Sequence, residues 1–428
     1  MPRVVVVGGG WSGCAAAIAA RKAGADVVLL ERTDQLLGTG LVGGIMRNNG
    51  RFTAAEEAIA LGAGELFGAC DKVARHVNVE FPGHKHATLY DVAKIEPLVR
   101  KIVVEQFEVD VRFETRVTDV ELEGSKIVAV KSEDGERFNG DVFVECTGTA
   151  GPQGNCTKYG NGCCMCIIRC PTFGPRISLA AKAGVKEMIG GSAAGTPGAM
   201  SGSCKLLKES LAPEIVKQLD SAGVAIVPIP EELRKKDALK FKACQQYALP
   251  EFAENLVLLD TGHAKLMTSF FPLAKLRKIP GFENARYEDP YAGGRGNSIR
   301  YIGISPRSNA LKTEGVDNLF CGGEKTGPLV GHTEAIVTGT LAGHNAVRYA
   351  LGMELLELPR NLAIGDAIAF VGEQVKTKDG LFKKYTFSGS VYFERMKELG
   401  LYTTDVGQIG ERVRKAGLEG VFSKRLVN

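Results

Sequence analysis

The chain has 428 residues, of which 44% are hydrophobic and 24% charged, and its formal net charge is +4. This length predicts two or three domains, and the composition is that of a globular protein. No apolar stretch is long enough for a membrane span or a signal peptide, so we expect a cytoplasmic protein without membrane contact.

The N-terminus carries a dinucleotide-binding pattern. Val4 to Val7 form a β-branched run typical of a strand buried on both faces, and a G-x-G-x-x-G turn follows. In such a turn Gly8 allows the tight bend, Gly10 lets a pyrophosphate approach, and Gly13 lets the next helix pack on the strand. The following apolar run ends in Glu31, where an acid binds ribose hydroxyls.

Two later segments favour FAD over free NAD. Strands are expected at 116–121 and 127–130, and a further strand ends on Thr147-Gly148, similar to the second nucleotide-contacting motif of glutathione-reductase-like flavoproteins. Near the C-terminus a strand ends in Gly323-Glu324, and a long helix is expected from His332 to Leu351. In this class of flavoprotein the acid binds the ribityl chain, and the helix N-terminus stabilises negative charge on the reduced flavin.

The predicted fold is α/β. A glutathione-reductase-like, FAD-binding Rossmann domain comprises 1–150 and 306–350, an inserted α+β domain comprises 151–305, and a small helical appendage comprises 351–428. His84 and His86 flank Lys85 in an expected solvated loop. The residues expected to bind FAD are Gly8, Gly10, Gly13, Glu31, Arg32, Gly43, Gly44, Val117, Thr147, Gly148, Gly323 and Glu324.

The layout resembles the flavoenzymes that modify tRNA uridine at carbon five, over roughly residues 1–350. The residues that carry this resemblance are 43–50, the Ile-Pro-Gly-Phe-Glu-Asn-Ala stretch at 279–285, and 327–343. One branch is the folate- and FAD-dependent tRNA uracil methyltransferases, and the other is the larger flavoprotein of the carboxymethylaminomethyl-uridine pathway. The resemblance implies that the loop with Gly43 and Gly44 meets the flavin. The methyltransferases carry a catalytic cysteine near this loop, whereas residues 41–50 contain none.

Five of the 11 cysteines fall within 15 residues, at Cys156, Cys163, Cys164, Cys166 and Cys170. The spacing Cys163-x-x-Cys166-x-x-x-Cys170-Pro171 matches that of the last three cysteine ligands in the bacterial iron–sulfur motif C-x-x-C-x-x-C-x-x-x-C-P. The first cysteine of that motif would fall at position 160, which is a glycine here. A 4Fe-4S cluster held with Cys156 or Cys164 as the fourth ligand, a redox or nucleophilic thiol pair, and a zinc site all stay open.

Three functions therefore compete. The main hypothesis is an FAD-dependent oxidoreductase whose flavin exchanges electrons with a cysteine-bound centre and whose partner is a small molecule or a protein. The alternatives are a tRNA-uridine-modifying flavoenzyme with a loop cysteine as nucleophile, and an electron-transfer subunit of a redox complex. No second complete G-x-G-x-x-G follows a strand, so NAD(P)H, if it is the reductant, would bind transiently. A homo-oligomer is expected. The catalytic candidates are Cys163, Cys166, His332 and Arg47, and the metal-ligand candidates are Cys156, Cys163, Cys166 and Cys170.

Overall fold

A computed structural model describes most of the chain, with gaps in the middle. The described residues are 1–148, 176–191, 199–200, 203–234, 239, 245–268, 271–288, 299–300 and 302–427. The cysteine cluster from Cys156 to Cys170 lies outside them, so the iron–sulfur, thiol and zinc hypotheses stay predictions.

A five-stranded parallel sheet forms the centre of the molecule. Its order is β19 (Leu319–Cys321), β10 (Val142–Glu145), β1 (Arg3–Val7), β2 (Asp26–Leu30) and β6 (Asp110–Arg112). Along β1, Val4 and Val6 pack into the core on one face, whereas Val5 and Val7 pack into the core on the other. The prediction of a strand buried on both faces is therefore confirmed.

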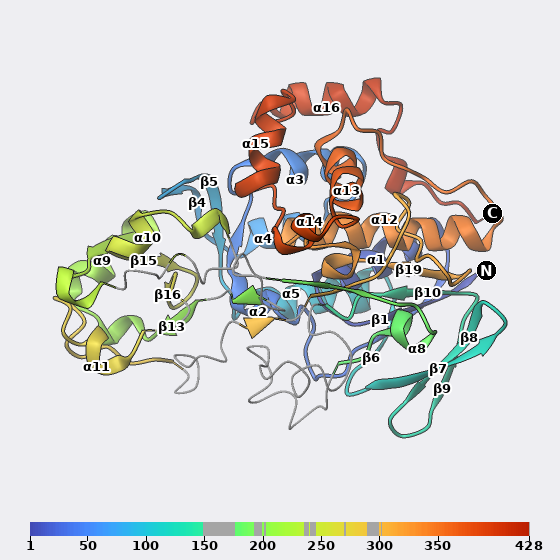
Figure 1. The fold of residues 1–428 in the computed structure, drawn as a ribbon, viewed down its shortest axis with the longest axis horizontal. Coiled ribbons are helices and arrows are strands. Elements are labelled where there is room, and N and C mark those ends of the chain that lie inside the picture. The colour runs from blue at the N-terminus through green and yellow to red at the C-terminus, as the bar shows by residue number, and fades with distance from the viewer. Residues whose placement is uncertain are drawn as a thin grey trace.

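Two helices pack on one face of this sheet, α1 (Trp11–Ala23) and α12 (His332–Ala350). They approach to backbone contact, because a Cβ atom at Gly339 or Gly343 would lie 2.1 Å from a carbonyl oxygen of α1. The other face is covered by the antiparallel sheet of β7 (Val117–Glu123), β8 (Lys126–Ser132) and β9 (Arg137–Asn139). Figure 1 shows α1 and α12 side by side, and the small sheet of β7, β8 and β9 at the lower right of the view.

The chain between β10 and β19 builds a second sheet with its own core. Its strands are β13 (Cys204–Leu206), β16 (Ala264–Leu266), β15 (Asn255–Asp260) and β14 (Val224–Pro228), and α9 (Pro213–Ala222) packs on them. This α+β unit stands at one end of the molecule in Figure 1. It has the expected fold class, while its boundaries at 151–305 stay a prediction.

A third antiparallel sheet joins β3 (Ile45–Met46), β5 (His84–Tyr90) and β4 (Ala74–Phe81). The expectation of a solvated loop around His84 is wrong. His84 begins β5 and is 2% exposed; its Nδ1 lies 2.9 Å from Asn48 Nδ2, and its Nε2 lies 3.0 Å from the Gln246 carbonyl oxygen. The histidine is buried because β4 and β5 pack against the inserted domain.

The C-terminal region is helical, as expected. It contains α13 (Ala363–Gln374), α14 (Lys378–Phe382), α15 (Ser390–Glu398) and α16 (Val406–Lys415). These helices contribute to the same hydrophobic core as α1 and α12. The boundaries of the helical appendage at 351–428 stay a prediction. Within the described residues, every helix is too short or too polar to cross a membrane.

Shorter elements connect these units. The helices are α2 (Gly40–Gly43), α3 (Gly50–Ala60), α4 (Glu65–Lys72), α5 (Ile95–Lys101), η1 (Ile102–Gln106), α8 (Leu179–Lys182), η2 (Lys208–Ser210), η3 (Glu231–Leu233), η4 (Gln245–Tyr247), α10 (Glu251–Glu254), α11 (Leu273–Leu276), η6 (Gly323–Thr326) and η7 (Val421–Ser423). The remaining strands are β11 (Met188–Gly190), β12 (Ala199–Met200), β17 (Ile299–Arg300) and β18 (Ile302–Ile304).

Candidate functional site

A cavity of about 250 Å³ runs along the carboxyl ends of β1, β2 and β10, from the glycine turn to the start of α12. It brings together most of the residues that the sequence nominates: Gly8, Gly10, Glu31, Arg32, Gly43, Val117, Thr147, Gly148, Gly323, Glu324 and His332. Gly13 packs against Gly8, which lines the cavity, whereas Gly44 and Arg47 are not among the described lining residues.

The glycine turn has the shape that a pyrophosphate needs. Gly8 has φ +100°, and a Cβ there would lie 2.4 Å from the Cys146 carbonyl oxygen. A Cβ at Gly13 would lie 1.8 Å from the Gly8 carbonyl oxygen, so α1 packs directly on the turn. At Gly10, in contrast, a Cβ would meet no atom within 4 Å among the described residues. The open cradle at Gly10 and the N-terminus of α1, which no described side chain caps, fit a dinucleotide phosphate.

Glu31 orders the same turn from the end of β2. Its Oε2 accepts a hydrogen bond from the Gly9 N–H at 2.6 Å, and its Oε1 accepts one from the Thr33 N–H at 2.9 Å. An ionised carboxylate has about four acceptor positions, so each oxygen retains capacity for a ribose hydroxyl. The residue lines the cavity and is 7% exposed. This donor and acceptor set fits the ribose of a dinucleotide.

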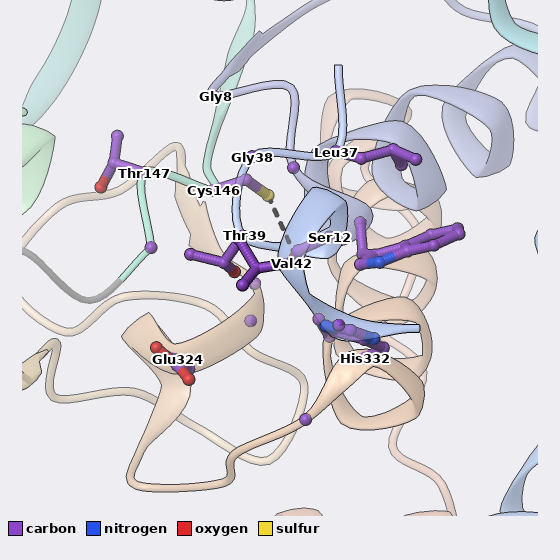
Figure 2. A pocket seen from close by; sticks show the side chains of 18 of the residues that line it. Gly8, Ser12, Leu37, Gly38, Thr39, Val42, Cys146, Thr147, Glu324 and His332 are labelled. Carbon is purple, nitrogen blue, oxygen red and sulfur yellow. Dashed lines mark hydrogen bonds between the residues drawn. The ribbon is translucent and has the colours of Figure 1, made fainter. Parts of the chain in front are cut away.

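The opposite end of the cavity is formed by two helix starts. Gly323 has φ +67°, and its N–H donates to Thr338 Oγ1 at 2.9 Å, which fixes the turn that carries Glu324. Val330, Gly331 and His332 line the cavity where α12 begins, and no described side chain caps that helix. Figure 2 shows Thr147 and Glu324 on one side of the pocket and His332 on the other. The positive end of the α12 dipole therefore faces the cavity.

His332 is held between α2 and two aromatic rings. A Cβ at Gly43 would lie 1.7 Å from His332 Cε1, so the imidazole packs directly on that glycine. The Trp11 and Tyr90 rings have centroids 6.0 and 6.4 Å from the imidazole, and the Tyr90 hydroxyl oxygen lies 3.3 Å from His332 Nδ1. The helix start was visible in the sequence, but nothing in the periodicity signalled Trp11 or Tyr90 as neighbours.

Arg51 is a second residue that sequence reasoning missed. It is 5% exposed, lines the cavity and contacts α12 through Glu334, with Nε 3.1 and 3.0 Å from the two carboxylate oxygens. Its other nitrogens donate to Asn48 Oδ1 at 3.1 Å, to the Val330 carbonyl at 3.2 Å and to Thr386 Oγ1 at 3.0 Å. A basic residue at the start of a helix carried no distinguishing pattern.

The inserted domain also lines the cavity, through Ser203, Gln246, Tyr247, Lys265 and Met267. Lys265 Nζ donates to the Val42 carbonyl at 2.6 Å, and Lys205, its cross-strand neighbour, donates to the Leu41 carbonyl at 3.4 Å. Two lysines of the inserted domain thus donate to two carbonyls of α2, the turn that packs on His332. The inserted domain therefore shapes the cavity as well as covering it.

Arg47 is engaged elsewhere. Its guanidinium forms ion pairs with Glu56 and with Asp71, the latter at 2.8 Å. These acids hold the pKa of Arg47 above its ordinary value, although burial acts against them. The geometry therefore gives Arg47 a structural task, and a catalytic role for it stays a prediction.

The described cysteines are poor nucleophiles. Cys14, Cys70, Cys146, Cys204 and Cys321 are all buried, and none of these five forms a disulfide bond. Burial raises the pKa of Cys146 to about 12 and that of Cys321 to about 12, so both thiols stay protonated near neutral pH. Among the described residues, no three His, Cys, Asp or Glu side chains are grouped so that they could hold a metal ion.

The parallel sheet, the glycine turn and the paired acid define a class, the flavoproteins with an FAD-binding Rossmann domain. Within that class, the chain belongs to the Glucose inhibited division protein A family, whose model matches residues 3–210 and 260–354. The resemblance seen in the sequence is thereby confirmed.

Individual relatives match over shorter segments. The tRNA uridine 5-carboxymethylaminomethyl modification enzyme MnmG of Chlorobaculum tepidum is 34% identical over 116 residues, which are 27% of this chain and 18% of the relative. The methylenetetrahydrofolate–tRNA-(uracil-5-)-methyltransferase TrmFO of Caldicellulosiruptor bescii is 39% identical over 95 residues, 22% of this chain and 21% of the relative. The matched segments thus span about a fifth of these curated relatives.

Solved structures agree on the fold. GidA of Aquifex aeolicus superposes with a TM-score of 0.65 in one crystal form and 0.63 in another, at 16% sequence identity. The first superposition covers 97% of this chain and 76% of that protein.

Proposed function

We propose that this protein is an FAD-dependent enzyme that modifies uridine in tRNA at carbon five. The observation that carries the proposal is the family match across both halves of the Rossmann domain, which coincides with a cavity built from the same residues. Both curated relatives described above are, by name, tRNA uridine-modifying enzymes. The alternative that the sequence offered thus gains more support than the main hypothesis of a flavin coupled to a cysteine-bound centre.

The chain's own residues have distinct tasks in this proposal. Gly8, Gly10 and the start of α1 hold the pyrophosphate, Glu31 holds the adenosine ribose, and Glu324 holds the ribityl chain. When bound, FAD supplies the redox chemistry for the group that is added to the base. The α12 N-terminus favours negative charge on the ring edge, and His332 exchanges a proton with the substrate.

The nucleophile has to come from the cysteine cluster in this proposal. Attack on uracil carbon six needs a thiolate, and residues 41–50 contain no cysteine. Cys70 is fully buried, and burial raises the pKa of its thiol. Cys163 and Cys166 are therefore the candidates. The Cys163-x-x-Cys166-x-x-x-Cys170-Pro171 spacing also keeps a second candidate function, a flavin oxidoreductase with an iron–sulfur centre, open to test.

The test combines tRNA chemistry with a designed cofactor variant. The reduced holoenzyme is incubated with uridine-containing tRNA and methylenetetrahydrofolate, and the nucleosides are analysed by mass spectrometry. We expect a modified uridine whose mass is higher than that of uridine. Gly10→Ala should fold normally, because its Cβ has space, but lose about tenfold or more in FAD affinity by intruding on the phosphate cradle. Unmodified uridine together with salt-insensitive, weak tRNA binding would contradict the proposal.

Iron analysis of anaerobically purified protein separates the two candidates. Iron at about four atoms per chain, with absorbance beyond that of flavin, would support the oxidoreductase with a 4Fe-4S centre. Flavin absorbance alone, with loss of uridine product in Cys163→Ser or Cys166→Ser, would support the nucleophile. NAD(P)H as reductant and a homo-oligomeric state are proposals that the same preparation tests, by flavin bleaching and by light scattering.

A further inference from the structure

Tyr90 lies behind the imidazole of His332. It ends β5 and is fully buried, and its backbone N–H donates to the Gly44 carbonyl at 3.0 Å. Its hydroxyl donates to the Gly40 carbonyl at 3.0 Å and lies 3.3 Å from His332 Nδ1. The hydroxyl is thus fixed between the first residue of α2 and the first residue of α12.

The single proton of this hydroxyl decides the direction of both hydrogen bonds. The Gly40 carbonyl can only accept, so the Tyr90 proton points at it in the shorter of the two contacts. The hydroxyl oxygen then offers only lone pairs to His332, and Nδ1 must be the donor. Burial raises the pKa of Tyr90, so the phenol keeps its proton at working pH.

Gly43 and Trp11 both pack against the imidazole of His332. Gly43 packs against its Cε1 edge, and a Cβ there would also lie 2.6 Å from Nε2. Trp11 stands at 6.0 Å between ring centroids, tilted by 37°. His332 stands at the positive end of the α12 dipole. A neutral imidazole with its proton on Nδ1 carries its lone pair on Nε2.

We propose that Tyr90 is a positioning residue that fixes His332 in the Nδ1–H tautomer, so that Nε2 acts as the proton acceptor beside the cavity. The inference rests on the proposed function in one respect, the catalytic use of His332. The tautomer itself is a property of the folded chain and can be measured without turnover.

The test is nitrogen NMR of the full-length holoprotein labelled with ¹⁵N-histidine. The His332 signals are assigned as those that vanish in His332→Gln. We expect a protonated Nδ1 and an unprotonated Nε2 in the wild type, and an Nε2–H population of half or more in Tyr90→Phe. Tyr392→Phe is the matched control, because Tyr392 is also fully buried and its hydroxyl donates to the Ala363 carbonyl at 2.7 Å, in the C-terminal helices.

Two outcomes would overturn the inference. One is an Nε2–H tautomer in the wild type, which needs no variant to fold, and the other is an unchanged tautomer in Tyr90→Phe. In the uridine assay, Tyr90→Phe should lower kcat about tenfold or more with KM unchanged and alter the acidic limb of the pH profile, whereas Tyr392→Phe should not. If the NMR shows the expected tautomer but the assay yields no modified uridine, the positioning role of Tyr90 is supported and the proposed function is contradicted.

Discussion

Arg51 of α3 and Glu334 of α12 form a buried ion pair, with 3.0 Å between Arg51 Nε and Glu334 Oε2. Glu334 also accepts hydrogen bonds from Thr386 and from the Phe387 N–H, in the segment that follows α14. A Cβ at Gly331 would lie 2.0 Å from the Glu334 carboxylate, so only glycine fits between the pair and the cavity. The pair therefore holds the first turn of α12 against the cofactor cavity and the C-terminal region.

Loss of the Arg51 guanidinium should weaken both folding and FAD binding. In Arg51→Met the Glu334 carboxylate stays buried without its partner, which costs about 3–5 kcal/mol of unfolding free energy. We expect FAD affinity to fall roughly tenfold as the α12 start shifts. Arg51→Lys should recover part of the stability, because it keeps the charge but loses the fork of donors. Urea unfolding and flavin fluorescence measure the two effects.

The control is Arg395→Met. Arg395 makes two hydrogen bonds to Asp366, at 2.8 and 2.9 Å, within the C-terminal helices. It should lose stability without losing FAD affinity at temperatures where it is folded. Equal losses of affinity in both variants would contradict a specific role for the Arg51–Glu334 pair.

A single methyl group at Gly43 should disturb His332. In Gly43→Ala the Cβ would lie 1.7 Å from His332 Cε1, so the ring or α2 has to move, at a cost of about 1–3 kcal/mol. We expect weaker FAD binding and a changed His332 NMR signal. Gly68→Ala in α4 has no atom within 4 Å of its Cβ among the described residues, so it should be neutral or stabilising by about 0.5–1 kcal/mol. An FAD affinity of Gly43→Ala equal to that of the wild type would contradict this prediction.

His344 should make the fold sensitive to acid. It is fully buried on α12 beside Phe422, and neither ring nitrogen has a hydrogen-bond partner among the described residues. Burial, and secondarily Arg348, lowers its pKa from 6.5 to about 4. The unfolded chain binds this proton more readily, so stability is full above pH 6.5 and falls between pH 6.5 and 4, by roughly 3 kcal/mol.

Comparison of variants isolates this contribution. His344→Leu should flatten the dependence of unfolding free energy on pH below 6.5, as measured by urea unfolding at several pH values. His263, whose pKa burial and then Lys205 and Lys265 lower to about 4, should contribute separately, and His263→Gln measures its share. A His344→Leu profile parallel to that of the wild type would show that the buried imidazole is not the sensor.

Glu57 should anchor the C-terminal helices. Its carboxylate is fully buried, accepts hydrogen bonds from the Ala363 and Ile364 N–H groups at 2.9 and 3.0 Å, and lies 3.4 Å from Arg412. Glu57→Ala leaves these donors without an acceptor, and we expect a loss of about 3 kcal/mol and faster proteolysis within 363–423. Asp405→Ala, at the exposed N-cap of α16, should cost only about 1 kcal/mol. Similar proteolysis of the two variants would argue against the anchor.

The sequence by itself determined the dinucleotide half of this protein. Gly8, Gly13 and Glu31 could be recognised because their requirements are local: a turn with positive φ, a close helix–strand approach and an acid at a strand end. The order of three such motifs predicted the Rossmann domain and the family. The sequence also placed the cysteine cluster, whose chemistry stays a prediction.

Only the tertiary structure decided which distant residues meet around the cavity. Arg51 and Glu334 are 283 positions apart, and Tyr90 and His332 are 242 apart. No periodicity links such positions, because their meeting depends on how α3, β5 and α12 pack around a shared core. The same packing buried His84, which the sequence had placed in solvent, and drew Arg47 into ion pairs with Glu56 and Asp71. Local backbone requirements can be recognised in the sequence pattern, whereas the partners of buried polar side chains depend on how the elements pack in the fold.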